Sequence, residues 1–475
     1  MSSARRSPHR RGSINGHRPE HADRGWPSSD IKDEGTSPAP ISVVEGVVER
    51  MVPGGLSLLR DEEGIVFARG GLAGERVVVE VRQRRGGVRH GVVTEVLRRS
   101  PERTVPDCAA HPQCGGCDFL HLSEATQAEA KHQMVVDALR RLGKLTEAQL
   151  SRVRPTEAAT HFAGARRRAR LSVSQDGDIG FHVRGGTEVI PITDCPALTG
   201  SLRSVVEDLA ETEFLLPGAS LQLACDDDGR VSIAVASSSP RRETEAFARR
   251  LVDTGIATGS LVLSNRGHVT ERFGHPTLHG EVAAGCIGGP YQSDAATFTQ
   301  ATRHGGLAIT RLVVEAALGS RHILELFAGA GHLTLPLAAL GAQVVAIEGD
   351  AEASRWLLRN AEHAPFRERI EAMCHRVGEH TLDALAVEGR HFDVLVADPP
   401  RTGIEGLGSI LSVFAVPTLV LVSCDLATGS RDLRIALDHG YELSWLAPID
   451  AFPRTSHVEW VARLERLATP VAPTP

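Results

Sequence analysis

The feature that most constrains the fold is an alternation of strand and helix patterns that begins near residue 305 and continues to the end of the chain. Strands that alternate with helices form a mostly parallel sheet with helices on both faces. The sequence therefore predicts an α/β, doubly wound, Rossmann-like domain over residues 286–475. Strand patterns occur at 322–326, 343–347, 394–397 and 418–423, and helix patterns at 307–318, 333–340 and 351–361.

The first of these strands leads into a glycine turn that opens a helix and contains Gly329 and Gly331. Such glycines let the backbone approach a ligand at the carboxyl ends of the strands, although a purely structural turn can look the same. Glu348 ends the next strand, about 17 residues after Gly331, where an acid accepts hydrogen bonds from ribose hydroxyls. The third glycine of a dinucleotide site is missing, which favours S-adenosylmethionine over NAD.

Three further side chains that can do chemistry follow or begin later strands. Asp398 precedes two prolines directly after 394–397, and Cys424 directly follows 418–423. A free cysteine is most often a small buried hydrophobe, but a thiolate at the ligand-binding edge of a sheet is a good nucleophile. Glu459 lies in a late strand; a lone carboxylate is usually a solvated charge, yet beside a nucleophilic cysteine it becomes a candidate base.

A cysteine cluster lies far upstream of these motifs. Cys108, Cys114 and Cys117 fall within ten positions, and Cys195 is a possible fourth member. Thiolates at this density bind a metal or a cluster. Four cysteine ligands fit a [4Fe–4S] cluster, with structural zinc as the alternative.

The N-terminal part of the chain has a different texture. Residues 1–40 lack an apolar pattern and are predicted to be a disordered tail. Short β-like runs separated by glycines at 41–98 predict a small β-barrel. Its last hairpin and exit are rich in arginine, which suits either phosphate binding or a charged, protected sheet edge. A helix is predicted at 123–142 with Ser123 as its N-cap, and strands at 168–174, 180–183, 188–192, 221–224, 231–235 and 261–263.

Composition limits the classes of function. The formal charge of −7 and pI near 6.3 are not those of a protein that coats nucleic acid through bulk charge, so any RNA contact must use local patches. The 8 cysteines do not form the dense framework of a small secreted domain. The sequence shows neither a secretory signal nor an apolar run long enough to cross a bilayer, and we expect a cytoplasmic protein with no membrane partner.

Taken together, these motifs resemble those of the iron–sulfur RNA (uracil-C5) methyltransferases, whose ribosomal-RNA members carry an N-terminal TRAM barrel. The resemblance covers about residues 41–475 and includes Cys114-Gly115-Gly116-Cys117 and an arginine-rich stretch from Arg166 to Leu171. It implies that Cys424 is the nucleophile and Glu459 the proton acceptor. It further implies S-adenosylmethionine contacts by Gln300, Phe327, Gly329, Gly331, Glu348 and Asp398, RNA contacts by Phe298, Arg166 and Arg168, and cluster ligation by Cys108, Cys114, Cys117 and Cys195.

The same resemblance implies the organisation and the reaction. The expected parts are a tail (1–40), a TRAM barrel (41–100), a cluster segment with a central mixed α+β RNA-binding domain (101–285) and a methyltransferase domain (286–475). The expected function is methylation of C5 of a uridine in RNA by a monomer, with ribosomal RNA favoured over transfer RNA. A catalytically decayed RNA-binding protein is the alternative from another class. Three positions depart from the family pattern: His332 (usually Asn), Thr302 (usually Asn) and Leu426 (usually Pro).

Overall fold

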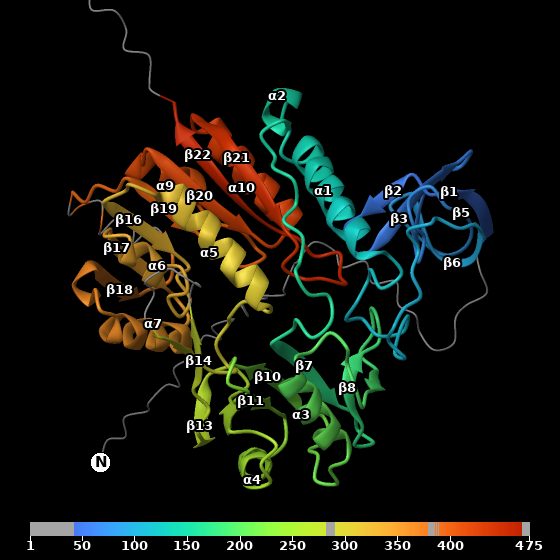
Figure 1. Ribbon diagram of the computed structural model, residues 1–475, viewed down its shortest axis with the longest axis horizontal. Helices are drawn as coiled ribbons and strands as arrows, with labels where there is room; N and C mark the ends of the chain where they lie inside the picture. Colours follow the sequence, from blue (N-terminus) through green and yellow to red (C-terminus); the bar gives the residue numbers. More distant parts are fainter. Residues whose placement is uncertain (1–41, 282–289, 379–384, 386, 388, 468–475) are drawn as a thin grey trace, which may run out of the picture.

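The computed structural model describes residues 42–281, 290–378, 385, 387 and 389–467. The predicted tail at 1–40 lies outside these residues. Three large sheets follow one another along the chain (Figure 1). The N-terminal sheet lies on the right of the view, the central sheet at the bottom and the C-terminal sheet at the upper left.

The N-terminal sheet has six strands in the order β1-β5-β6-β4-β3-β2. Alternate residues of β5, among them Val77 and Val79, are fully buried, which gives the sheet one apolar face. The predicted β-like runs at 41–48, 64–68, 75–82 and 91–97 correspond to β1, β4, β5 and β6, whereas β2 and β3 were not predicted. The strands are β1 (Ser42–Val47), β2 (Arg50–Val52), β3 (Leu56–Asp61), β4 (Gly64–Arg69), β5 (Arg76–Arg85) and β6 (Val88–Arg98).

The central sheet has seven strands in the order β13-β12-β11-β10-β7-β8-β9. All six predicted strands of this region are confirmed, and β13 is an addition. A core of fully buried leucines and isoleucines, including Leu171, Leu221 and Ile233, lies between the sheet and helices α3 (Gly200–Ala210) and α4 (Arg241–Asp253). The strands are β7 (Arg168–Val173), β8 (Ile179–His182), β9 (Val189–Pro191), β10 (Ser220–Cys225), β11 (Val231–Ala236), β12 (Gly259–Leu263) and β13 (Val269–Gly274).

The C-terminal sheet confirms the doubly wound α/β prediction. Its order is β18-β17-β16-β19-β20-β22-β21, and its strands are parallel except β22, which runs antiparallel to both neighbours. The strands are β16 (His322–Leu326), β17 (Gln343–Glu348), β18 (Ile370–Cys374), β19 (Val394–Ala397), β20 (Thr418–Ser423), β21 (Tyr441–Ile449) and β22 (Glu459–Arg466). The helices are α5 (Arg303–Ala317), α6 (Thr334–Ala339), α7 (Ala351–His363), α9 (Leu407–Phe414) and α10 (Leu426–Asp438), with a short 3-10 helix, η1 (Arg367–Arg369).

The two faces of this sheet bury different side chains. Val420 and Val422 of β20 pack in one core with α5 and α6, whereas Leu419 and Leu421 of the same strand pack in another core with α9 and α10. Successive residues of a strand point to opposite faces, so a strand buried on both sides reads as an uninterrupted apolar run. This is why the sequence showed these strands clearly.

Helix α1 (Glu124–Arg141) begins at the predicted N-cap Ser123, whose side chain accepts a hydrogen bond from the backbone N–H of Thr126. Its apolar side chains Val135 and Leu139 are buried in the core of the C-terminal sheet. After α2 (Glu147–Leu150), the chain runs beside β21 through bridges from Val153 and Glu157. Residues 124–157 therefore pack with the C-terminal sheet, as Figure 1 shows. A separate two-stranded sheet, β14 (Leu278–Glu281) with β15 (Pro290–Ser293), spans the predicted boundary at 285.

Candidate active site

Three of the predicted cofactor residues lie side by side at the carboxyl edge of the C-terminal sheet. Leu326 of β16 pairs with Ile347 of β17 on one side and with Ala397 of β19 on the other. The next residue along each strand is Phe327, Glu348 or Asp398, so all three emerge at the same edge. This is the edge at which open parallel sheets bind ligands.

The glycine turn has an unusual backbone. Phe327 adopts a φ of 62°, Gly329 58° and Gly331 93°. A side chain at Gly331 would also come within 3.1 Å of Leu357. A non-glycine residue at positive φ is strained, and such strain concentrates at functional sites. The sequence predicted the turn but not the left-handed conformation of Phe327.

Glu348 is held in place by the glycine turn. Its Oε2 accepts a hydrogen bond from the backbone N–H of Gly329 at 2.8 Å, and its Oε1 accepts one from the backbone N–H of Asp350 at 2.6 Å. A carboxylate can accept more than one hydrogen bond at each oxygen. The fixed carboxylate can therefore also accept hydrogen bonds from the two hydroxyls of a ribose.

A buried acid that the sequence analysis did not single out, Glu325, lies in β16 two residues before Phe327. Glu325 is fully buried in β16, and burial raises its pKa to about 8, with the negative charges of Asp398 and Glu348 adding to the effect. Burial also raises the pKa of Asp398 to about 7. The signal in the sequence was a glutamate inside an otherwise apolar strand. A carboxyl that stays neutral beside an ionised one reduces repulsion in a crowded acidic site.

The antiparallel strand β22 brings the predicted nucleophile and base together. Ser423, the last residue of β20, pairs with Trp460 of β22. The adjoining residues, Cys424 and Glu459, therefore face each other across the end of this strand pair. They lie 35 residues apart in the sequence, and only the reversed direction of β22 places the start of one strand beside the end of the other.

The charges of this pair act on each other. Burial, together with the negative charges of Glu459 and Asp398, raises the pKa of the Cys424 thiol to about 12, and Arg401 opposes these effects. Burial likewise raises the pKa of Glu459 to about 8, with Asp398 adding to the effect. Glu459 Oε2 has no hydrogen-bond partner among the residues that the structure describes. Cys424 and Glu459 therefore both favour their protonated forms at pH 7.

A helix N-terminus adjoins the thiol. Asp425 is the N-cap of α10 and accepts hydrogen bonds from the backbone N–H groups of Ala427 and Thr428 at 3.0 and 2.9 Å. Cys424 immediately precedes this cap, and the partial positive charge of a helix N-terminus favours a thiolate. Leu426, one of the three departures from the family pattern, is the first helical residue and packs its side chain into the core.

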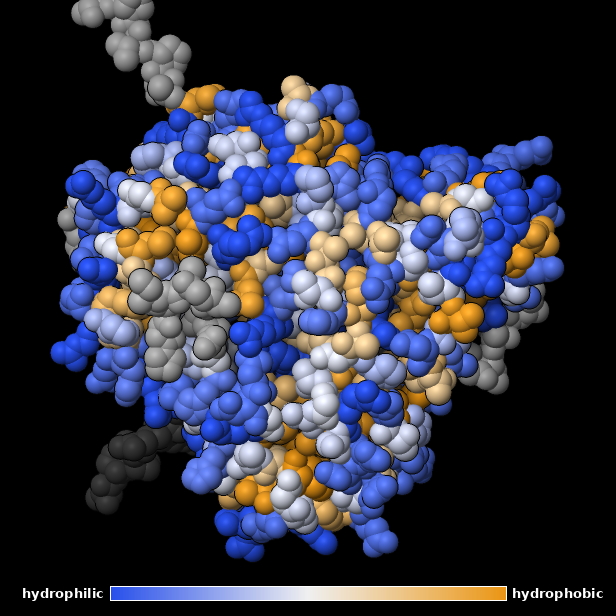
Figure 2. Space-filling model, viewed as in Figure 1, coloured by the Kyte–Doolittle hydropathy of each residue, from blue (hydrophilic) through white to orange (hydrophobic). Residues whose placement is uncertain are grey.

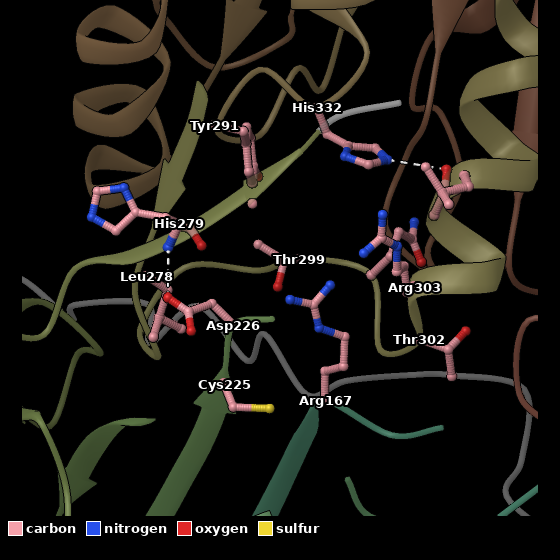
Figure 3. A pocket seen from close by; sticks show the side chains of 15 residues that line it. Arg167, Cys225, Asp226, Leu278, His279, Tyr291, Thr299, Thr302, Arg303 and His332 are labelled. Carbon is pink, nitrogen blue, oxygen red and sulfur yellow. Dashed lines mark hydrogen bonds between the residues drawn. The ribbon is translucent and has the colours of Figure 1, made fainter. Parts of the chain in front are cut away.

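Gln300 lies in a separate cavity of about 70 Å³ between the central sheet and α5 (Figure 3). His332 lines the same cavity, and a side chain added at Gly306 would come within 3.5 Å of both residues. The His332 Nε2 and the Thr310 hydroxyl form a hydrogen bond at 3.0 Å. Because His332 directly follows Gly331, the cavity borders the glycine turn. Phe327, Glu348 and Asp398 do not line it.

Thr302, another departure from the family pattern, has a structural role. It is the N-cap of α5: its hydroxyl accepts a hydrogen bond from the backbone N–H of Gly305 at 3.1 Å and donates one to the backbone oxygen of Ala451 at 2.8 Å. A threonine satisfies both groups at a helix start. The substitution therefore leaves α5 capped and joined to the loop that follows β21.

Phe298 and Arg168 occupy opposite environments. The Phe298 side chain is 68% exposed, which is unusual for a large aromatic residue. The Arg168 guanidinium donates to the backbone oxygens of Ala295 and Thr297 and to the hydroxyl of Thr299, at 2.8, 2.6 and 2.8 Å. Burial lowers the Arg168 pKa to about 10. Arg168 thus holds the segment that presents Phe298.

The four predicted cluster cysteines converge on one small cavity of about 30 Å³, which Arg166 also lines. Burial raises the pKa of the thiols of Cys114, Cys117 and Cys195, and Arg166 lowers each of these values. The backbone N–H of Gly116 donates to the Cys114 sulfur at 3.4 Å. Within the described parts of the chain, no group of three or more His, Cys, Asp or Glu side chains is close enough to hold a metal ion as it stands. The side chain of Arg166 lies beside the cysteines in this cavity.

The arginine-rich hairpin β5–β6 is largely engaged in ion pairs within the sheet. Arg89 pairs with Asp61 at the turn between β3 and β4, and Arg84 pairs with Glu63 at 2.9 Å. Arg103 donates to both carboxylate oxygens of the buried Glu75. The space-filling view shows this side of the molecule as mostly hydrophilic with small apolar patches (Figure 2). These contacts favour the charged, protected edge over a dedicated phosphate site.

A known structure shares this fold. The crystal structure of the Pyrococcus abyssi tRNA (uracil-54, C5)-methyltransferase in complex with S-adenosyl-L-homocysteine has the same overall fold, with a TM-score of 0.68. The two sequences are 20% identical, and the match covers 89% of this chain and 100% of that one. A family profile described as "Conserved hypothetical protein 95" matches residues 312–412.

Two curated relatives are more similar in sequence. Both are named 23S rRNA (uracil(1939)-C(5))-methyltransferase RlmD. The Halomonas elongata protein is 32% identical over 450 residues, covering 89% of each chain. The Aromatoleum aromaticum protein is 32% identical over 454 residues, covering 90% of this chain and all of the relative.

The fold and the named relatives identify the chain as an S-adenosylmethionine-dependent RNA (uracil-C5) methyltransferase. At 32% identity over nearly the whole length of these relatives, the chain belongs to the RlmD family.

Proposed function

We propose that the protein methylates C5 of one uridine in 23S ribosomal RNA, the uridine that corresponds to position 1939 in the names of its relatives. The observation that carries the proposal is the placement of Cys424 opposite Glu459, beside Asp398, at the ligand-binding edge of the sheet. A pyrimidine ring between the first two would have a nucleophile for C6 and a base for the proton on C5. S-adenosylmethionine supplies the electrophilic methyl group.

The reaction needs three steps from the chain's own residues. The Cys424 thiolate adds to C6, which places the electron pair of the former C5–C6 double bond on C5 and O4. C5 then takes the methyl group of S-adenosylmethionine as the S–CH3 bond breaks and S-adenosylhomocysteine leaves, and the Cys424–C6 bond persists. Glu459 removes the C5 proton, the double bond reforms, and the Cys424 sulfur leaves as a thiolate. Overall, uridine and S-adenosylmethionine become 5-methyluridine, S-adenosylhomocysteine and one proton, and Cys424 returns to its starting thiolate.

Burial at the site sets the protonation states before the reaction. With a pKa of about 12, Cys424 is a neutral thiol at pH 7 when the site is empty. Arg401 favours the thiolate, as does the N-terminus of α10. We propose that the cationic sulfonium further favours ionisation of Glu459 and Asp398, because an opposite charge nearby lowers the pKa of a carboxyl. Cofactor binding thus prepares the base.

The target uridine must leave any base stack before its C6 is accessible. We propose that Phe298 stacks on the extruded base or on an adjacent one. Its side chain is exposed, and Arg168 supports its segment through hydrogen bonds to the neighbouring Thr297 and Thr299. Gln300 follows two residues later and borders the glycine turn through His332. The same segment would then contact both the RNA and the cofactor.

The all-sulfur donor set of the four cysteines suits a [4Fe–4S] cluster, with zinc as the alternative, although the thiols are not close enough together to hold a metal as they stand. Their side chains surround one cavity, the donor set is all sulfur, and the Gly116 N–H already donates to one sulfur. We propose that Cys108, Cys114, Cys117 and Cys195 hold the group and that it supplies cross-linking between segments distant in the sequence. Iron analysis of Cys117→Ser tests this: we expect loss of the iron, whereas Cys374→Ser, at an exposed cysteine, keeps it.

The chain is also proposed to have three folded parts. We propose that residues 41–100 form a TRAM barrel, that residues 101–285 contain the cluster segment and the central RNA-binding domain, and that residues 286–475 form the methyltransferase domain. The protein is expected to act as a monomer in the cytoplasm. Within the described residues, no helix has both the length and the apolar character needed to cross a membrane.

A covalent trapping experiment tests the reaction. RNA with 5-fluorouridine at the target position cannot lose a proton from C5, so the Cys424–C6 bond should persist and give a protein–RNA complex that survives denaturation. Cys424→Ala should abolish the complex, and Cys374→Ala should leave it intact. A complex that forms without Cys424, or none with the natural protein, contradicts the proposal and favours the RNA-binding alternative.

The choice of RNA has its own test. Transfer RNA is the second candidate, because the structural neighbour with a TM-score of 0.68 is named as a tRNA enzyme. Mass spectrometry of 5-methyluridine in RNA from a deletion strain should show its loss from 23S rRNA alone. Loss from transfer RNA with intact 23S rRNA would reverse the assignment.

A further inference from the structure

A carboxylate next to the cysteine cluster joins three parts of the molecule. Asp118 directly follows Cys117, and its side chain is 11% exposed. Its Oδ1 accepts a hydrogen bond from Arg184 in the central domain. Its Oδ2 accepts hydrogen bonds from the hydroxyl and the backbone N–H of Ser456, at 2.9 and 3.3 Å. Ser456 lies three residues before Glu459.

Backbone contacts reinforce this junction. The N–H groups of Asp118 and Phe119 both donate to the backbone oxygen of Arg454, at 3.0 and 2.9 Å. Arg454 has a φ of 70°, and its guanidinium makes two hydrogen bonds to Asp107, at 2.7 and 2.8 Å. Residues 454–456 are thus held from the cysteine side at both the backbone and the side chains.

The same arginine that contacts Asp118 also contacts the cysteines. Arg184 donates to the backbone oxygens of Cys114, at 3.1 Å, and of Cys117. Hydrogen bonds therefore connect the two predicted ligands to Arg184, Arg184 to Asp118, and Asp118 to Ser456 in the loop before Glu459. Each of these hydrogen bonds lies in a largely buried setting. Hydrogen bonds to charged groups in such settings are strong and directional.

We propose that Asp118 is a positioning residue for the base: it fastens the cysteine segment to residues 454–456 and thereby holds Glu459 opposite Cys424. The inference rests on the proposed function, because it assigns Glu459 the removal of the C5 proton. It gives the cysteine segment a role in the last step of catalysis. A segment that loses its folded arrangement would release the base without altering the nucleophile.

The expected signature is specific to that last step. In Asp118→Asn, the amide oxygen can still accept a hydrogen bond from Ser456. The new amide N–H₂ group takes the place of the oxygen that accepted from Arg184, so two donors face each other and that hydrogen bond is lost. Cys424 still adds to C6 and C5 still takes the methyl group, but the C5 proton leaves slowly. A methylated protein–RNA adduct should therefore accumulate on unmodified uridine RNA. We expect kcat to fall at least about tenfold while the KM for RNA stays unchanged.

A second variant approaches the junction from the loop side. Ser456→Ala removes the hydroxyl that donates to Asp118 without changing the cysteine segment, and Ser456→Thr restores it. We expect adduct with Ser456→Ala and near-normal turnover with Ser456→Thr. If Asp118→Asn fails to fold or loses its iron, the two Ser456 variants decide the question alone.

The matched control is Asp194→Ala. Asp194 also adjoins a predicted ligand, Cys195, and pairs with an arginine, Arg203, at 2.7 and 2.8 Å, but both side chains are about half exposed. It should accumulate no adduct. Amide hydrogen exchange on the full-length, iron-loaded protein gives a readout independent of turnover: the Ser456 amide should lose protection in Asp118→Asn and keep it in Asp194→Ala.

Two results overturn the inference. One is normal turnover with no adduct in both Asp118→Asn and Ser456→Ala. The other is a lowered kcat without adduct, which places the defect before methyl transfer. If the natural protein forms no complex with 5-fluorouridine RNA, the proposed function itself fails, and that result is distinguishable because it does not depend on Asp118.

Discussion

Lys131 and Asp450 lie 319 residues apart in the sequence and form an ion pair in which neither side chain is exposed to solvent. Lys131 also donates to the backbone oxygen of Phe452 at 2.9 Å. The pair joins α1 to the start of the loop that leads to Glu459. It thus links the N-terminal half of the chain to the catalytic edge of the C-terminal sheet.

Removal of Lys131 should destabilise the protein strongly. Lys131→Met leaves the Asp450 charge buried without its partner, and we expect the free energy of unfolding to fall by about 3–5 kcal/mol. Urea unfolding measures the change. The double variant Lys131→Met with Asp450→Leu should recover most of the loss, since neither charge is then buried. A loss below about 1 kcal/mol in the single variant would contradict the buried pair.

Stability should depend on pH through Glu459. Its folded pKa is about 8, whereas an unfolded glutamate ionises near about 4.3. Between these values the folded protein holds a proton that the unfolded chain releases, so this group's stabilising contribution is complete below the lower value and is lost as pH rises through the higher one. Each unit of elevation corresponds to about 1.4 kcal/mol.

Glu459→Gln removes this dependence. The variant should match the natural protein in stability near pH 4 and exceed it increasingly toward pH 9, as measured by thermal unfolding across that range. It should also trap the methylated adduct, because it lacks the base. Parallel stability curves for the two proteins would show that Glu459 is not held protonated by its surroundings.

Phe298 should matter for RNA and not for folding. A stacked aromatic contributes about 1–3 kcal/mol of binding free energy per base. Phe298→Ala should therefore raise the KM for RNA by the factor that a loss of about 1–3 kcal/mol in binding free energy produces, and Phe298→Trp should keep most of the affinity. Unfolding free energy should change by less than about 0.5 kcal/mol. Leu318→Ala, at another exposed apolar side chain, is the control and should leave RNA binding unchanged.

Arg168 should matter for folding more than for direct RNA binding. Arg168→Met leaves three oxygen acceptors without their donor, and we expect a loss of about 2–4 kcal/mol in unfolding free energy. Affinity for S-adenosylhomocysteine, measured by calorimetry, should fall as well, because Gln300 follows the segment that Arg168 holds. Arg170→Met, at the exposed position two residues along the same strand, should change neither. If Arg168→Met weakened RNA binding alone, direct RNA contact would be its main role.

The sequence predicted what local patterns encode. Uninterrupted apolar runs such as Leu419–Val422 marked the strands of the doubly wound sheet, and residues placed directly after them, such as Asp398 and Cys424, emerged at one edge because parallel strands share their direction. The sequence did not predict short strands such as β2, whose three residues are too few to show alternation.

Contacts between distant segments were also beyond the sequence. The apolar face of α1 showed that something covers this helix, but not that the C-terminal sheet does. Arginines of the β5–β6 hairpin looked available for phosphate, because their partners, such as Asp61 and Glu63, come from another turn. The roles of Asp118 and Lys131 depend on residues more than 300 positions away, and a lone charge in a sequence gives no sign of its partner.

The packing of α1 on the C-terminal sheet sets an order for synthesis. A ribosome adds about 5–20 residues per second, so Lys131 emerges tens of seconds before Asp450, 319 residues later. Throughout that interval Val135 and Leu139 of α1 lack the C-terminal sheet against which they pack. The apolar side chains that α1 buries against the C-terminal sheet therefore stay exposed until the last strands are made.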